Sequence, residues 1–126
     1  TMLPPMRLDP EKIKQALLNI LLNALNVLPQ GGTISIRSRE TADPEFLDGR
    51  RGVQVEICDS GPGISSDDID YIFDPFFTRN PGGFGLGLSI THTIIEEHKG
   101  KILVESELGK GACFTILLPV SEPLRG

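Results

Sequence analysis

The 126-residue sequence lacks tryptophan and contains only two cysteines. Cys58 and Cys113 lie far apart in the sequence, and each falls on a predicted strand. Free cysteine behaves as a small and often buried side chain, and disulfides are rare in reducing compartments. We therefore expect both cysteines to be reduced core residues of a cytoplasmic protein, with neither a disulfide nor a bound metal.

Positive charge is also scarce, since twelve Lys and Arg residues stand against seventeen Asp and Glu. The net charge of -5 and the scattered basic residues argue against a nucleic-acid surface. A bound polyanion would therefore have to be held by backbone amides or by a metal ion. No apolar run approaches the roughly 20 residues of a membrane span and no secretory leader is present, so we expect a soluble chain without membrane contact.

The length and the hydrophobic content of 39% are those of one soluble domain that encloses one core and one pocket. The sequence has no internal repeat and no low-complexity tract. We expect residues 9–120 to form the domain, residues 1–8 to be a frayed lead-in and residues 121–126 to be a tail.

The first predicted helix runs from Pro10 to about Leu28, with Asp9 as its N-terminal cap. One side carries an apolar stripe at helical spacing, made of Ile13, Leu17, Ile20, Leu21, Ala24 and Leu28. Beside it lies a stripe of amides, made of Gln15, Asn19, Asn23 and Asn26. Asparagine is a mediocre helix former, but its neutral carbonyl oxygen can ligate a hard cation such as Mg²⁺ near phosphates. The alternative is that these are incidental surface amides.

The most informative stretch is Asp-Ser-Gly-Pro-Gly-Ile, which begins at Asp59, directly after a predicted strand, and ends at Ile64. Asp59 has the strand parity of the aliphatic residues two and four positions before it, so its carboxylate should point to the apolar face. Gly61 and Gly63 lack the Cβ atoms that would keep a flat ligand away from the backbone. The pattern predicts a pocket for a planar ligand with an amino group, and a plain turn is the alternative.

A second glycine-rich stretch, Asn80 to Leu88, leads into a predicted helix that ends near His98. We expect the apolar side of this helix to include Ile90, Ile94 and Ile95. A glycine loop that opens a helix presents unpaired N–H groups and a positive dipole end to an anion. With the phenylalanine-rich residues 72–78 as one hinge, we interpret residues 74–87 as a lid that is disordered when its site is empty.

The remaining elements complete a two-layer fold. We predict a strand over residues 32–39, an exposed connection to a strand over 53–58, and a short helix up to Ile72 that Ser65 or Ser66 caps. A hairpin follows, with strands 101–107 and 112–118. This order indicates an α/β two-layer sandwich with a mixed, mostly antiparallel sheet that helices cover on one face.

Four motifs in this order resemble the catalytic, ATP-binding domain of bacterial two-component sensor histidine kinases, within the gyrase, Hsp90, histidine kinase and MutL superfamily. Residues 19–24 are similar to its N box, 59–64 to its G1 box, 73–77 to its F box and 83–88 to its G2 box. The resemblance covers residues 9–119 and implies the Bergerat ATP-binding fold.

The resemblance also implies roles for single residues. Asp59 would accept a hydrogen bond from the adenine amino group, and Asn23 would ligate Mg²⁺ with help from Asn19, which makes these two asparagines the implied catalytic residues. The full set implied around ATP is Asn19, Asn23, Asn26, Asp59, Gly61, Gly63, Ile64, Phe73, Gly83, Phe84, Gly85, Leu86, Gly87 and Leu88.

In superfamily members that hydrolyse ATP, and in anti-sigma serine kinases, a glutamate general base occupies the position of Asn19. An amide cannot act as this base, so transfer to a histidine on another domain is favoured. His92 and His98 read as surface positions of the last helix. The phospho-accepting histidine would then lie on a dimerisation domain outside this sequence, in a homodimeric kinase that passes the phosphoryl group to a response regulator. The fragment itself would be monomeric.

Four positions depart from the family pattern, namely Asn26, Asn80, Phe84 and Ala112. Each replaces a lysine, another basic residue or a threonine that is common in relatives, and so removes a charge or a hydrogen-bonding group near ATP. We therefore expect real but modest ATP binding. The alternatives are a non-catalytic nucleotide-binding or docking module, and an anti-sigma-type serine kinase.

Overall fold

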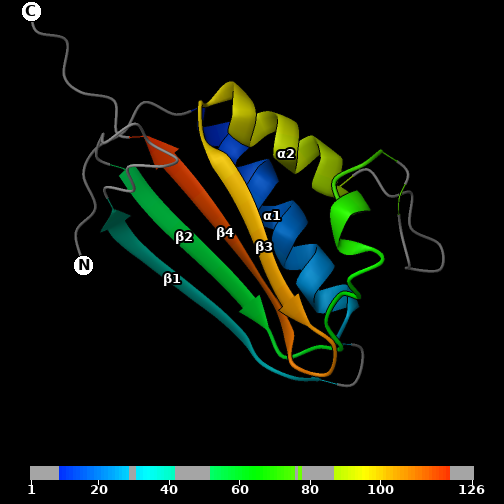
Figure 1. The fold of residues 1–126 in the computed structure, drawn as a ribbon. Helices are drawn as coiled ribbons and strands as arrows, with labels where there is room; N and C mark the ends of the chain where they lie inside the picture. The colour runs from blue at the N-terminus through cyan, green and yellow to red at the C-terminus, as the bar shows by residue number, and fades with distance from the viewer. Residues whose placement is uncertain (1–8, 29–30, 42–51, 76, 78–86, 120–126) are drawn as a thin grey trace, which may run out of the picture.

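The computed structural model describes residues 9–28, 31–41, 52–75, 77 and 87–119. These described residues form two helices, four strands and one 3₁₀ turn (Figure 1). Their bounds are α1 Pro10–Asn26, β1 Ile34–Thr41, β2 Gly52–Asp59, η1 Ile69–Tyr71, α2 Gly87–Glu97, β3 Lys101–Glu107 and β4 Gly111–Pro119.

The four strands form one sheet in the order β1-β2-β4-β3, and both helices lie against the same face of it (Figure 1). This architecture confirms the predicted α/β two-layer sandwich. All three pairings among the described strands are antiparallel, so the parallel component that a mixed sheet would have is not found among them.

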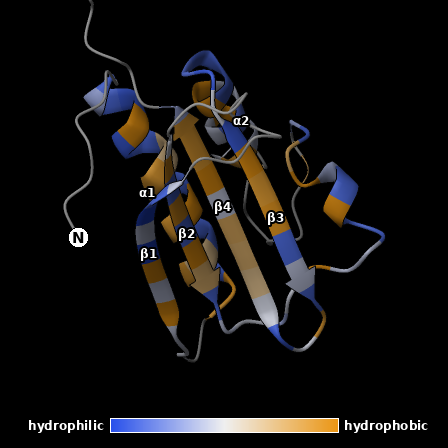
Figure 2. Cartoon of the chain, turned by 60° about the vertical axis from the view of Figure 1, so that its left-hand side comes forward, coloured by the Kyte–Doolittle hydropathy of each residue, from blue (hydrophilic) through white to orange (hydrophobic). Residues whose placement is uncertain are grey.

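The core lies between the sheet and the helices because alternate strand residues point to the helix side. Ile57 of β2 faces Phe114 of β4, and Ile116 of β4 faces Ile102 of β3; all four side chains are buried. From α1 the buried residues are Ala16, Ile20 and Ala24, which lie along one line of the helix. In Figure 2, β4 is coloured as hydrophobic along most of its length, as expected for a central strand.

Helix α1 begins as predicted, since Asp9 Oδ1 accepts a hydrogen bond from the Lys12 amide at 3.2 Å. The helix ends at Asn26, two residues before the predicted Leu28. Its first turn lies beside the last turn of α2, because the Asp9 amide donates to His98 Nε2 at 3.1 Å. His98 Nδ1 lies 2.8 Å from the carbonyl of Ile94, so this histidine links two helix ends rather than standing alone on the surface.

The expectation about the apolar face of the last helix was wrong in part. In α2, Ile94 and Ile95 are buried as predicted, but Ile90 is 37% exposed and Thr91 takes a fully buried position instead. Thr91 is tolerated there because its hydroxyl donates to the Gly87 carbonyl at 2.8 Å. In β1, Ile36 points to the helix side yet is 57% exposed, because β1 is an edge strand of the described sheet.

The predicted short helix is present only as the 3₁₀ turn η1. Neither Ser65 nor Ser66 caps it with its side chain; Asp68 precedes the turn and makes no side-chain cap bond either. The Ser65 carbonyl instead accepts from the amides of Asp68 and Ile69, both at 3.0 Å. In the described part of the chain, neither helix combines the length and apolar character needed to cross a membrane.

The expectation of two reduced cysteines was wrong, because Cys58 and Cys113 form a disulfide. The two residues stand directly opposite each other on β2 and β4. Their parity puts them on the sheet face away from the helices, where both are half-buried, so they do not belong to the core. A pairing across 55 residues depends on strand register, which residue spacing alone does not reveal.

Candidate functional site

The predicted pocket acid, Asp59, is the last residue of β2 and points to the helix side of the sheet. It is 8% exposed, a rare condition for a carboxylate without a partner. Oδ1 accepts a hydrogen bond from the Gly61 amide at 2.9 Å. Because a carboxylate has about four lone-pair positions, this bond leaves capacity for a further donor, such as an amino group.

The packing of the loop itself requires glycine at positions 61 and 63. We had expected these glycines for a different reason, namely to let a flat ligand approach the backbone. Gly63 has a φ of +79°, and a Cβ there would lie 2.3 Å from the Glu107 carbonyl oxygen. A Cβ on Gly61 would lie 2.9 Å from both Asp59 Oδ1 and Val27 Cγ2. The glycines therefore let the loop pack closely on the rest of the chain.

The loop after Asp59 is fastened to the hairpin of β3 and β4. The Pro62 carbonyl accepts from the Gly109 amide at 2.8 Å, and the Ile64 amide donates to Ser106 Oγ at 2.7 Å. Ser106 in turn donates to the Gly111 carbonyl at 2.9 Å. Ser106 could not be identified from the sequence, because a serine within a strand has no distinctive spacing.

The amide stripe of α1 contacts the start of α2. Asn19 Nδ2 donates to the Gly87 carbonyl at 3.2 Å, which joins α1 to the first turn of α2. Asn19 and Asn23 are half-buried, whereas Asn26 is exposed. With Nδ2 of Asn19 engaged, Oδ1 is the atom that would ligate a cation.

Phe73 lies between two other rings. It meets Phe114 of the core edge-on, with ring centroids 6.3 Å apart, and the His92 ring at 5.3 Å. His92 Nε2 is 3.0 Å from Glu96 Oε1, so His92 is also more than a surface position. This arrangement holds Phe73 between β4 and α2, at the start of the predicted lid.

Part of the predicted site lies outside the described residues, namely the lid residues 76 and 78–86 with Gly83, Phe84, Gly85 and Leu86. Gly87 and Leu88 are described, and α2 starts at Gly87. The first N–H groups of a helix have no partner within it and carry the positive end of its dipole. The end of the glycine-rich stretch thus lies beside Asn19 with the features expected of a phosphate-binding helix start.

One hollow of about 350 Å³ lies between α1 and α2, lined by Lys12, Gln15, Pro75, Ser89, Ile90, Thr93, Ile94 and Glu97. Its lining includes Gln15 of the amide stripe but none of Asn19, Asn23 and Asp59. Among the described residues no group of three or more His, Cys, Asp or Glu side chains could hold a metal. Any cation near Asn19 and Asn23 would therefore depend on amide oxygens and on the oxygens of a ligand.

Residues 8–122 match the sequence profile of the histidine kinase-, DNA gyrase B- and HSP90-like ATPase family. The chain is 43% identical over 119 residues to the sensor histidine kinase ZraS of Escherichia coli K12, which covers 94% of the chain and 24% of that protein. It is 39% identical over 120 residues to sporulation kinase E of Bacillus subtilis, which covers 95% of the chain and 15% of that protein. The chain thus spans a quarter or less of these two relatives.

Solved structures of histidine kinases are also similar to this chain. The catalytic domain of histidine kinase ThkA, in a nucleotide-free form, is 36% identical with a TM-score of 0.75, over 91% of this chain and 70% of that one. Full-length ShkA in complex with AMPPNP is 29% identical with a TM-score of 0.77, over 96% of this chain and 24% of that one.

Proposed function

Because the chain belongs to the histidine kinase-, DNA gyrase B- and HSP90-like ATPase family, we propose that it binds Mg-ATP and donates the γ-phosphoryl group to a histidine. In sequence and fold it corresponds to the catalytic domain of histidine kinases. The accepting histidine lies on a separate dimerisation domain of a longer kinase, which then passes the phosphoryl group to a response regulator.

The observation that carries this proposal is the environment of Asp59. A nearly buried carboxylate at a strand end, oriented by the Gly61 amide and facing the helix side, is a good acceptor for one amino group of a flat base. The loop that follows is fastened to the hairpin through Pro62 and Ile64, so the acceptor is held in place before a ligand arrives.

The residues around Asn19 suit the phosphates and their metal. Mg²⁺ favours oxygen ligands and usually keeps several waters while it binds substrate phosphates. One amide oxygen from Asn23, with that of Asn19 as a second candidate ligand, fits this demand without adding negative charge. When bound, Mg²⁺ would neutralise charge on the phosphates. The N–H groups at the start of α2 supply the remaining positive field.

The residues of this chain then act by positioning. Phosphoryl transfer needs the attacking atom and the leaving oxygen nearly in line, and little covalent chemistry from the protein. Asn19 holds the first turn of α2 to α1 through the Gly87 carbonyl, which sets the helix start against the phosphates. Since an amide cannot take a proton at neutral pH, the base that serves the nucleophile belongs to the domain with the histidine.

We place the chain in the cytoplasm as a monomeric domain within a homodimeric kinase. The proposed use of intracellular ATP supports the cytoplasmic location, and the much greater length of the relatives supports a domain within a longer kinase.

The binding step is tested by calorimetric titration of ATP, with and without Mg²⁺, against the chain, Asp59→Asn and a matched control. Asp70→Asn is the control, because Asp70 is an exposed carboxylate on η1. We expect binding that requires Mg²⁺ and that has the same affinity in Asp70→Asn. In Asp59→Asn the affinity should fall by at least tenfold, which is about 1.4 kcal/mol of binding free energy. Equal affinity in the two variants would remove Asp59 from the site, and no binding by the chain would refute the proposal.

The transfer step is tested by mixing the chain and labelled ATP with a separately produced histidine-bearing dimerisation domain of the same kinase. We expect label on that domain and none on this chain. A domain whose histidine is replaced by glutamine should stay unlabelled. Binding of ATP without any transfer would favour a non-catalytic nucleotide-binding module, and label on a serine would favour a serine kinase.

A further inference from the structure

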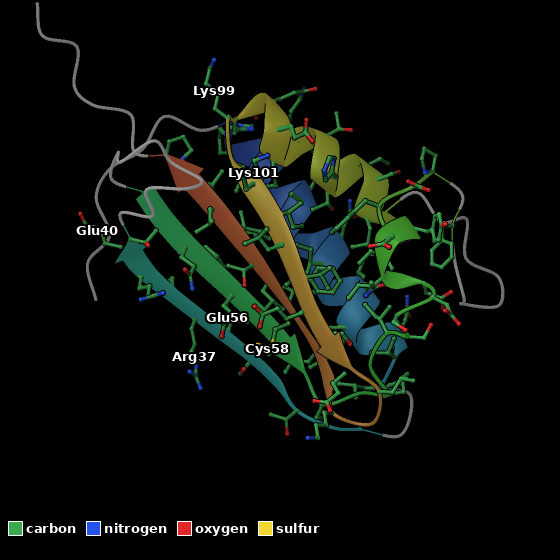
Figure 3. The ribbon with its side chains drawn as sticks, viewed as in Figure 1. Arg37, Glu40, Glu56, Cys58, Lys99 and Lys101 are labelled. Atoms are coloured by element: carbon green, nitrogen blue, oxygen red, sulfur yellow. A yellow bond between two sulfur atoms is a disulfide. The ribbon has the colours of Figure 1, made fainter. Side chains whose placement is uncertain are left out.

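The disulfide between Cys58 and Cys113 has no role in the site described above, and it lies on the opposite face of the sheet. Figure 3 shows Cys58 and Glu56 on β2, away from the helices. Both cysteines are half-buried on this face. The bond therefore differs from a disulfide enclosed in a core.

The bond also lies next to Asp59 along the sheet. Cys58 directly precedes Asp59 in β2, and Cys113 directly follows Ala112, which is the partner of Asp59 on β4. Beyond this pair β2 runs into the glycine loop. A Cβ on Gly111 would lie 2.0 Å from the Asp59 carbonyl oxygen, so the two strands are already in close contact there. The disulfide thus joins β2 to β4 covalently, one residue before Asp59.

Glu56 can accept a hydrogen bond from the Cys58 thiol when the disulfide is reduced. Its Oε1 lies 3.6 Å from the sulfur of Cys58. The disulfide leaves Cys58 without a proton to donate, whereas a thiol at this position has a carboxylate acceptor within reach. Glu105, which faces Cys113 from β3, adds a second negative charge to this face. The site can therefore accommodate both redox states.

We propose that Cys58 and Cys113 are a thiol–disulfide exchange site for low-molecular-weight thiols and disulfides, and that closing the bond tightens nucleotide binding at Asp59. The second half rests on the proposed function. A protein that uses ATP works where thiols are kept reduced, and disulfides found there are usually transient and regulatory. The dithiol is then the resting state, and oxidising conditions close the bond.

The exchange is balanced with glutathione disulfide as the oxidant. One protein thiol loses its proton and attacks a sulfur of glutathione disulfide, forming a mixed disulfide and releasing one glutathione thiolate. The second protein thiolate then attacks the protein sulfur of the mixed disulfide and releases the second glutathione. Each released thiolate takes up one of the two protons. The cysteine pair is oxidised by two electrons, and glutathione disulfide is reduced to two thiols.

The test measures binding and redox state on the whole chain. The chain is equilibrated in buffers with different ratios of reduced to oxidised glutathione, and the fraction of disulfide is read by alkylation and mass spectrometry. ADP with Mg²⁺ is then titrated into each form. We expect full conversion across the series, a folded chain by circular dichroism in both states, and roughly fivefold tighter ADP binding by the disulfide form, a modest coupling. The double variant Cys58→Ser, Cys113→Ser should bind like the dithiol in every buffer.

Linkage provides an internal check, since saturating ADP must shift the glutathione midpoint toward the disulfide by the same factor. Glu56→Gln should also favour the disulfide, by roughly fivefold, because the reduced thiol loses a charged acceptor. Glu11→Gln, on α1, is its control and should leave the midpoint unchanged.

Identical ADP affinity in the two forms would overturn the coupling and leave the proposed function standing. No ADP binding in either form would overturn both. If the pair remains a disulfide at all glutathione ratios, the bond is structural and the exchange site is overturned. The same conclusion follows if the chain unfolds when the bond is reduced.

Discussion

Replacing Gly63 by alanine tests whether the loop after Asp59 depends on its contact with the β3–β4 hairpin. Gly63 has a φ of +79°, and its new Cβ would lie 2.3 Å from the Glu107 carbonyl oxygen. The loop has to move away, which breaks its two bonds to the hairpin, from the Gly109 amide to Pro62 and from the Ile64 amide to Ser106.

A matched control separates this contact from backbone strain. Gly109 has a φ of +82°, but a Cβ there would meet no atom within 4 Å. Gly109→Ala therefore incurs the same strain of roughly 1–2 kcal/mol for a left-handed residue, without the clash. Gly63→Ala loses two further hydrogen bonds at about 1 kcal/mol each, so the variants should differ in unfolding free energy by about 2 kcal/mol.

The difference can be read as a melting temperature. With about 2.1 cal/mol/K of unfolding entropy per residue over 126 residues, 2 kcal/mol corresponds to about 8 °C. Thermal unfolding followed by circular dichroism should place Gly63→Ala below Gly109→Ala by this amount, and ATP titration should show weaker binding only in Gly63→Ala. Equal melting temperatures for the two variants would refute the idea that the hairpin shapes the loop.

Three other predictions concern stability. Removing the disulfide by Cys58→Ser with Cys113→Ser should lower the unfolding free energy by up to about 4 kcal/mol, the chain-entropy value for 55 residues; urea unfolding checks this, and a double variant as stable as the oxidised chain would contradict it. Lys99 has a φ of +61° after α2, so Lys99→Gly should raise stability by about 1 kcal/mol in thermal unfolding, and an unchanged midpoint would argue against strain there. Asp9→Ala should cost about 1 kcal/mol through its lost cap, while Asp9→Asn should cost little; equal losses in both would point away from capping.

The elements could be predicted because their signals are local. Asp9 and Pro10 mark the start of α1, and the alternation that ends at Asp59 marks β2 and the face on which the acid lies. These signals depend on residues close in sequence, where helical and strand periodicity are strong. The order of these elements then predicted the two layers, and the resemblance of four ordered motifs agreed with that prediction.

What could not be predicted depends on contacts between distant residues. The partner of Cys58 is set by the register of β2 against β4, and a shift of one residue would have placed it elsewhere. The exposure of Ile36 follows from the place of β1 at the edge of the sheet. The bond from Asn19 to Gly87 joins two residues 68 positions apart on two packed helices, so spacing predicted a polar stripe but not its partner.

The contact between the Asp59 loop and the hairpin also has a consequence for synthesis. Gly63 packs against Glu107, and the Asp59 carbonyl packs against Gly111 at the start of β4. A growing chain in which β4 has not yet left the ribosome holds every residue of the loop but lacks the surface that shapes it. Long-range contacts of this kind form late. The loop that holds Asp59 can therefore take its final shape only after β4 has been made.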